Sequence, residues 1–159
     1  MSHQVVVATA KYLVVLPVVV SSAWWAFRAD RNQRIRYLSI LVGGGVLAYL
    51  LAKVGGHLYE DPRPFITDQV VPYFESATDN GFPSDHTMLA AVFAAAMWPF
   101  HRVLSGLFYV MAVAVGLARV VAGVHHGVDV IGGLVLGTAG VAVAWVAMTL
   151  LESRHPVDL

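Results

Sequence analysis

The chain has 159 residues, of which 58% are hydrophobic and 13% are charged, and its formal net charge is zero. Soluble domains carry about 25% charged residues, so this composition is typical of a protein embedded in lipid. A net charge of zero gives no indication of nucleic-acid binding. Because the chain has no cysteine, disulfides, zinc–thiolate sites and a cysteine nucleophile are excluded.

Apolar runs recur along the chain, and about 20 such residues cross a bilayer core of about 30 Å. They predict an all-α integral membrane protein: a bundle of about five transmembrane helices with a short polar outer loop region, forming a single membrane-embedded domain over residues 1–159. The expected helices cover residues 5–27, 37–59, 84–100, 104–122 and 127–151.

The first run is interpreted as an uncleaved membrane helix, because no basic region precedes it and it ends at an arginine cluster. Pro17 is expected to kink it. Prolines and a glycine in residues 60–83 argue against a continuous helix there, and residues 68–76 are the part that could form a short interfacial helix.

Small residues in two of the expected helices favour close packing. Three glycines, residues 43–45, stand together in the second helix, and Gly133 and Gly137 form a small-xxx-small pattern in the fifth. We expect neighbouring helices to approach closely at both places.

Charged residues predict the orientation of the bundle. One membrane face receives Arg28, Arg31, Arg34, Arg36, Arg102 and Arg154, and the other receives Glu60, Asp61, Asp68, Glu75 and Asp79. The positive-inside rule places the arginine face in the cytoplasm. The N-terminus, the long polar loop and the turn between the last two helices then face outward, and the C-terminus is cytoplasmic.

Three polar clusters are expected to meet at the outer face. They are Lys53 with Arg63; Ser84, Asp85 and His86; and Arg119, His125, His126 and Asp129. Ser84 follows a proline and precedes an apolar run, so it is the expected N-cap of a helix. A helix N-terminus binds anions through its free N–H groups, although a plain capping motif is the alternative here.

The third cluster combines a histidine pair with an aspartate. His125 lies four residues before Asp129, so one helical face carries both and the carboxylate can accept a ring N–H. His126 lies three residues before Asp129 and could compete for this role. The fork of Arg119 suits phosphate, whereas a buried ion pair between Arg119 and Asp129 is the alternative.

Taken together, the clusters predict a phosphoryl-transfer site without a metal. Cations and N–H donors stabilise a phosphoryl group in its transition state, one histidine can be the nucleophile, and the other can be the general acid. A metal site is less favoured, because the histidines lack a dense set of carboxylates and three cations would repel a divalent ion.

These residues resemble the type 2 phosphatidic acid phosphatase superfamily of membrane lipid phosphatases. Its motifs are Lys-x6-Arg-Pro, Pro-Ser-Gly-His and Ser-Arg-x5-His-x3-Asp. The corresponding residues here are Lys53 with Arg63-Pro64, Pro83-Ser84-Asp85-His86, and Ala118-Arg119 with His125 and Asp129.

The resemblance implies a role for each residue. His125 would be the nucleophile that forms a phosphohistidine, Asp129 would orient it, and His86 would protonate the leaving group. The residues implied to hold the phosphate are Lys53, Arg63, Ser84 and Arg119. The x5 spacing from Arg119 selects His125 over His126.

The chain departs from the motifs at three positions. Nine residues separate Lys53 from Arg63 instead of six, Ala118 replaces a serine, and Asp85 replaces a glycine. Asp85 would act as a modulator if it met a cation or raised the basicity of His86. The sequence Pro-Ser-Asp-His resembles the bacterial branch that dephosphorylates undecaprenyl diphosphate.

We therefore expect hydrolysis of a lipid phosphate, with undecaprenyl or another polyprenyl diphosphate as substrate and without a cofactor, at the outer face of a bacterial or archaeal cell membrane. Phosphatidic acid or phosphatidylglycerol phosphate is the alternative substrate. A lipid phosphotransferase and a non-catalytic protein that binds lipid phosphates are further alternatives. The sequence does not indicate an oligomeric state.

Overall fold

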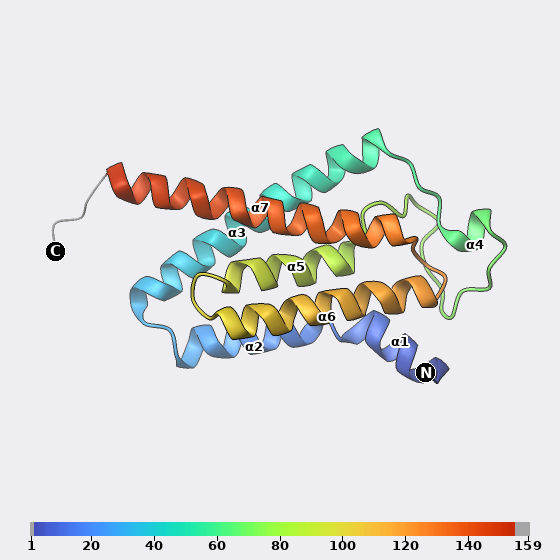
Figure 1. Ribbon diagram of the computed structural model, residues 1–159, viewed down its shortest axis with the longest axis horizontal. Helices are drawn as coiled ribbons and strands as arrows, with labels where there is room; N and C mark the ends of the chain where they lie inside the picture. Colours follow the sequence, from blue (N-terminus) through green and yellow to red (C-terminus); the bar gives the residue numbers. More distant parts are fainter. Residues whose placement is uncertain (1, 155–159) are drawn as a thin grey trace.

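The computed structural model describes residues 2–154, and their regular structure is helical (Figure 1). The helices are α1 (His3–Tyr12), α2 (Val15–Phe27), α3 (Arg31–Leu58), α4 (Pro64–Thr67), α5 (Asp85–Met97), α6 (Arg102–Val121) and α7 (Gly127–Arg154). This confirms the predicted all-α membrane fold. The second predicted helix begins earlier than expected, because Asp30 and Gln33 form a capping box at Arg31.

Four spans can be drawn by length and composition, namely α3, α6, α7 and the pair of α1 and α2 taken as one bent span. The pair bends by 43°. Pro17 has no N–H to donate to Leu13, whose carbonyl accepts from Leu16 at 3.1 Å instead. The predicted kink is confirmed, and it lies one turn before the proline.

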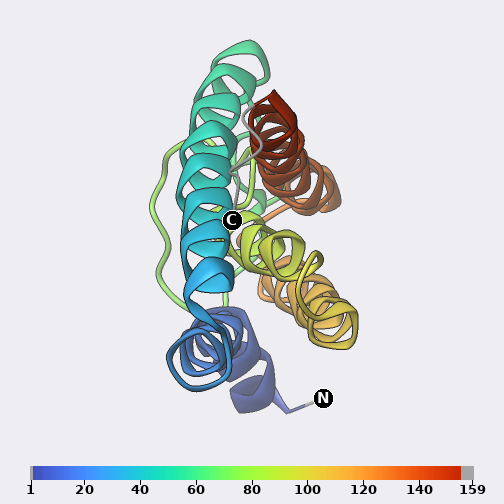
Figure 2. The same ribbon diagram turned by 90° about the vertical axis from the view of Figure 1, so that its left-hand side faces the viewer.

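The helix α5 lies at the centre of the bundle. It packs against α2, α3, α6 and α7, as Figure 2 shows end-on. It has 13 residues, a length of about 20 Å, which is shorter than a bilayer core. The prediction of a helix over residues 84–100 was too long, because the apolar sequence continues into a turn after Met97.

Glycines allow the helices to approach closely at the predicted places. A Cβ on Gly137 would lie 2.7 Å from the Met88 carbonyl of α5, and one on Gly133 would lie 2.7 Å from the Ser84 carbonyl. A Cβ on Gly44 would lie 2.7 Å from the Cα of Val141. The packing of α7 onto α5 therefore depends on small residues.

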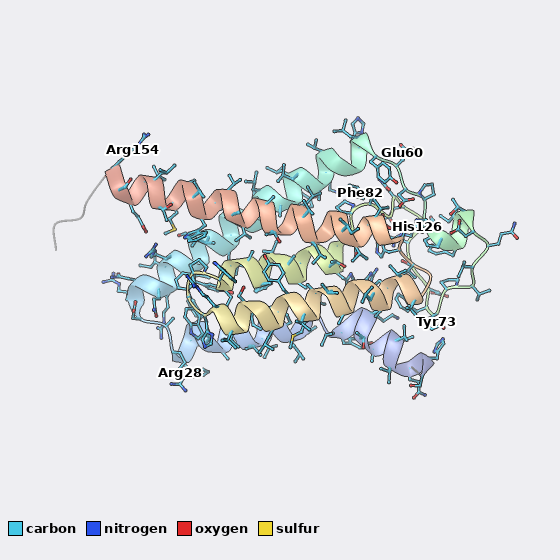
Figure 3. The ribbon with its side chains drawn as sticks, in the orientation of Figure 1. Arg28, Glu60, Tyr73, Phe82, His126 and Arg154 are labelled. Carbon is cyan, nitrogen blue, oxygen red and sulfur yellow. The ribbon has the colours of Figure 1, made fainter. Side chains whose placement is uncertain are left out.

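The polar loop differs from its prediction. Its helix, α4, covers Pro64–Thr67, whereas residues 68–76 are not helical. Pro64 starts α4 at its first position, and the chain leaves the helix at Gln69, whose φ is 55°. Figure 3 shows Arg28 and Arg154 at one end of the bundle and Glu60, Phe82 and His126 at the other.

Candidate functional site

The turn between α6 and α7 carries a buried histidine–aspartate pair. His125 is 2% exposed, and its Nδ1 lies 3.1 Å from Oδ2 of Asp129, which is in the first turn of α7. Gly123 makes this turn possible, because its φ is 72° and a Cβ there would lie 2.9 Å from Val70. The predicted contact between His125 and Asp129 is thus present.

Arg63 contacts the other ring nitrogen of His125. Its Nη1 lies 3.2 Å from Nε2 of His125 and donates to the carbonyl of Val124 at 3.0 Å. A guanidinium has no acceptor, so Nε2 must be the unprotonated nitrogen and Nδ1 carries the proton shared with Asp129. This arrangement fixes the neutral tautomer with its lone pair on Nε2.

The surroundings of His125 favour that neutral form. Burial lowers the pKa of His125, and the positive charges of Arg119 and Arg63 lower it further, against the raising effect of the hydrogen bond to Asp129. The net pKa is below the ordinary value, so Nε2 stays unprotonated at neutral pH.

Arg63 is itself held by a carboxylate. Its Nη2 and Nε donate to Oδ1 of Asp79 at 2.8 and 3.2 Å, and the Asp79 side chain is 68% exposed. A phosphate could therefore take the place of Asp79 at the surface of the site. The sequence did not reveal this role of Asp79, because no local spacing connects two loop residues that are 16 positions apart.

Arg119 lies in the last turn of α6 and is 6% exposed. Its Nη1 donates to the carbonyl of Ala10 at 3.3 Å, and its buried Nε has no hydrogen-bond partner within residues 2–154. Asp129 pairs with His125 and not with Arg119, which argues against the alternative of a structural ion pair. A buried donor without a partner is uncommon, and a bound anion would satisfy it.

The N-terminus of α5 borders the same place. Ser84 is the N-cap, as predicted, but its hydroxyl lies 3.0 Å from that of Thr87 and does not cap a backbone N–H. The backbone N–H of Ser84 donates to the carbonyl of Asp129 at 3.0 Å, which joins α5 to α7. The half-buried His86 is within electrostatic reach of Arg119, His125, Arg63 and Asp85.

Lys53 and Asp85 lie in a neighbouring groove. This groove has a volume of about 390 Å³, and Asp79, Phe82 and Pro83 also line it. The Nζ of Lys53 lies 5.2 Å from the centre of the Tyr49 ring. The structure thus brings Arg63, Arg119, His86 and His125 within electrostatic reach of one another, and Asp85 acts on Arg119 and His86. Ser84 is joined to Asp129, and Lys53 lies in the neighbouring groove.

His126 faces the acidic loop. Its ring lies between Asp61, at 3.1 Å from Nδ1, and Asp68, at 3.3 Å from Nε2, while its backbone N–H donates to Asp129 at 2.9 Å. Burial lowers the pKa of His126, but the hydrogen bond to Asp68 and the contact with Asp61 outweigh it and raise the pKa overall. This histidine is therefore engaged with carboxylates, away from Arg63.

Within the described residues, one group of side chains has donor atoms close enough together to be considered as metal ligands. These atoms lie within 4.8 Å of one another and belong to Asp61, His126 and Asp129. Two of these side chains already pair with each other, and the third holds His125. The absence of a metal from the reaction stays a prediction. The sequence placed Asp61 at this face of the membrane but did not predict its contact with His126, because the two residues meet only across the fold.

Comparison with known proteins identifies the family. The model of the PAP2 superfamily matches residues 35–152. The chain belongs to the PAP2 superfamily. Three curated relatives agree with this. The first is the bacitracin transport permease protein BcrC of Bacillus licheniformis, which is 32% identical over 94% of this chain and 74% of its own length.

The putative undecaprenyl-diphosphatase YbjG of Escherichia coli (strain K12) is 33% identical over 86% of this chain and 69% of its own length. The undecaprenyl-diphosphatase BcrC of Bacillus subtilis (strain 168) is 31% identical over 83% of this chain and 67% of its own length. The predicted family is confirmed, and this PAP2 protein is a lipid phosphatase of the membrane.

Two crystal structures share the fold. Aquifex aeolicus LpxE superposes with a TM-score of 0.67 at 21% identity, over 89% of this chain and 82% of LpxE. The PAP2-type phosphatidylglycerolphosphate phosphatase of Bacillus subtilis gives 0.58 at 25% identity, over 89% of this chain and 74% of that one. The helical bundle is thus that of transmembrane PAP2 phosphatases.

Proposed function

We propose that this PAP2 protein hydrolyses a polyprenyl diphosphate, undecaprenyl diphosphate above all, to the monophosphate through a phosphohistidine at His125. The observation that carries the proposal is the position of His125 between Asp129 and Arg63, which leaves the lone pair of Nε2 facing a guanidinium. The names of two relatives as undecaprenyl-diphosphatases support the substrate.

In the first step, Nε2 of His125 attacks the terminal phosphorus and the P–O bond to the lipid phosphate breaks. The proton on Nδ1 stays hydrogen-bonded to Asp129, which stabilises the charge that develops on the ring. His86 donates a proton to the leaving oxygen, and an entering phosphate anion favours the protonated form of His86 that this requires.

In the second step, water attacks the phosphohistidine and the P–N bond breaks. His86, now neutral, takes a proton from the water, so inorganic phosphate leaves and His125 recovers its lone pair. The net reaction consumes one water and one lipid diphosphate and gives one lipid monophosphate and one phosphate. Neither step requires an oxidant or a cofactor.

The phosphoryl group would be held by Arg119 and by Arg63, once the phosphate has displaced Asp79 from the Arg63 guanidinium. Ser84 and the free N–H groups of the first turn of α5 would hold it as well. Planar guanidinium groups bind phosphate oxygens in pairs, and a helix N-terminus adds a positive dipole end. Lys53 would act on the substrate from the neighbouring groove. Burial and the charge of Arg119 lower the pKa of His86, and the charge of Asp85 would offset part of this effect.

This site would face outward from the membrane, with the N-terminus on the same side and the C-terminus in the cytoplasm. The arginines at the opposite end of the bundle support this orientation through the positive-inside rule (Figure 3). A diphosphate lipid would then reach the site from the outer leaflet.

A second candidate substrate is phosphatidylglycerol phosphate. The similarity of the fold to a phosphatidylglycerolphosphate phosphatase favours it. Phosphatidic acid is a further glycerolipid to compare as a substrate, because its headgroup is likewise a phosphate monoester.

The test is phosphate release from purified protein in detergent micelles, with each lipid at the same mole fraction. We expect the highest kcat/KM on polyprenyl diphosphate, unchanged turnover in EDTA and inhibition by vanadate. The His125→Ala variant serves as the inactive control. A higher kcat/KM on a glycerolipid phosphate would assign that substrate instead.

A further inference from the structure

Two buried carboxylate oxygens near the turn between α6 and α7 lack a hydrogen-bond donor. They are Oδ2 of Asp61 and Oδ1 of Asp129, and neither has a hydrogen-bond partner within residues 2–154. The donor atoms of Asp61, Asp129 and His126 lie within 4.8 Å of one another. Two ionised carboxylates this close repel each other, and buried acceptors without partners are costly.

The other oxygen of each carboxylate lies close to a histidine. Oδ1 of Asp61 lies 3.1 Å from Nδ1 of His126. Oδ2 of Asp129 accepts from the backbone N–H of His126 at 2.9 Å and lies 3.1 Å from Nδ1 of His125. Each carboxylate therefore has one buried oxygen without a partner, and the two carboxyl groups belong to one cluster whose donor atoms lie within 4.8 Å of one another.

The backbone holds the two residues together. The N–H of Gly81 donates to the carbonyl of Asp61 at 2.8 Å, and the N–H of Asp61 donates to the side chain of Asn80 at 2.9 Å. A Cβ on Gly81 would lie 2.9 Å from the carbonyl of Asp61 and 3.0 Å from Oδ2 of Asp129. Gly81 thus lets the loop close over the carboxylate of α7.

We propose that Asp61 is a positioning residue that, as a neutral carboxylic acid, donates a hydrogen bond from Oδ2 to Oδ1 of Asp129. This inference rests on the proposed roles of His125 and Asp129. One proton between the two carboxyl groups satisfies both buried oxygens and removes the repulsion between them. Asp129 is then held at both oxygens and keeps the ring of His125 in one orientation.

The charges around the pair are consistent with a retained proton. Burial raises the pKa of Asp61, the neighbouring carboxylate of Asp129 raises it further, and His126 acts in the opposite direction. His126 is also bound to Asp68 on its far side. Arg63, two positions after Asp61, directs its guanidinium to Asp79 and His125 instead.

The experiment compares Asp61→Asn with Asp61→Ala, using the lipid phosphate that the wild-type protein hydrolyses fastest. The amide of asparagine has an N–H that can donate to Asp129 in place of the acid proton. We expect Asp61→Asn to keep kcat within about threefold of wild type and Asp61→Ala to lower it about tenfold or more, because Asp129 loses a buried partner. KM should change little in either variant, because Asp61 does not touch the phosphate site.

Asp68→Ala is the matched control, since it removes the exposed carboxylate on the other side of His126 and leaves Asp61 in place. It should keep the wild-type kcat. Equal losses in Asp61→Asn and Asp61→Ala would overturn the proposal, because the charge of Asp61 and not its proton would then matter. Wild-type turnover in Asp61→Ala would overturn it as well.

An infrared measurement tests the proton without any substrate. At neutral pH the wild-type protein should show the C=O band of a protonated carboxyl group, and the Asp61→Asn variant should lack it. Absence of the band in the wild type would overturn the proposal. Because this readout does not depend on turnover, it stays valid if the proposed substrate is wrong.

Discussion

At the scale of single residues, the chemistry of the site depends on the two neighbours of the His125 ring. The sequence predicted the Asp129 contact, because residues four apart on a helix face each other. It could not predict the Arg63 contact, which joins residues 62 positions apart through an irregular loop. The same loop brings Asp61 and Asp79 to the site, and no periodic pattern marks either one.

The first prediction concerns pH. His125 must be neutral to attack, and its pKa is lowered from 6.5 chiefly by burial. Activity should therefore persist as the pH falls below 6.5 and be lost only when it passes through the lowered pKa. The measurement is kcat/KM against pH at constant ionic strength. An acidic limb centred at or above the ordinary histidine value would contradict the assignment.

The second prediction concerns Arg119. Its buried Nε has no partner in the described residues, so we expect it to bind phosphate as a fork. Arg119→Lys keeps the charge and loses the fork, and should lower kcat/KM by about 10- to 100-fold. Arg28→Lys, at the opposite end of the bundle, is the control and should behave as wild type. An unchanged kcat/KM in Arg119→Lys would show that charge alone suffices there.

At the scale of helices, the site forms where the N-termini of α5 and α7 meet the C-terminal turn of α6. Apolar runs and the expected N-cap at Ser84 predicted these helices, since both signals are local. The early end of α5 has a local signal that the apolar pattern masked: Pro99 lacks a backbone N–H and disfavours helix at Trp98, which lies in an exposed turn. The glycine pattern of α7 indicated close packing without indicating its partner.

The third prediction tests this packing. Gly137→Ala places a Cβ 2.7 Å from the Met88 carbonyl, so α7 would have to shift from α5. We expect a loss of stability of about 1–3 kcal/mol, measured as a lower Tm in detergent. Gly106→Ala is the control, because a Cβ there meets nothing within 4 Å, and it should be neutral or stabilising.

If neither Gly137→Ala nor Gly106→Ala changed the Tm, the close approach of α7 to α5 would not depend on a small residue at position 137. A fall in both variants would point to a general sensitivity of the helices to substitution. Only a fall in Gly137→Ala alone agrees with the packing described above.

At the scale of the whole molecule, the bundle has one arginine-rich end and one end that carries the site (Figure 3). Large apolar side chains are exposed along its sides, for example Val42, Val110 and Leu150. Such a surface is stable in lipid and not in water. Composition and charge were sufficient to predict this arrangement. The lipid surroundings determine where apolar and charged residues lie, whatever the details of helix packing.

The fourth prediction tests the orientation. The chain has no cysteine, so single cysteines can be introduced at Thr78, near the site, and at Ser153, near the C-terminus. A membrane-impermeant maleimide should label Thr78→Cys in intact cells and label Ser153→Cys only after permeabilisation. The reverse pattern would place the site in the cytoplasm.

The measurement that tests the central claim most directly is the capture of the phosphoenzyme. Purified protein is mixed with a lipid diphosphate labelled at its terminal phosphorus, quenched in alkali, which preserves phosphohistidine, and digested for mass spectrometry. We predict the label on His125, its loss in His125→Ala, and its retention in His126→Ala. Label on His126, or turnover without any labelled histidine in wild type and in a slowed His86→Ala variant, would contradict the account.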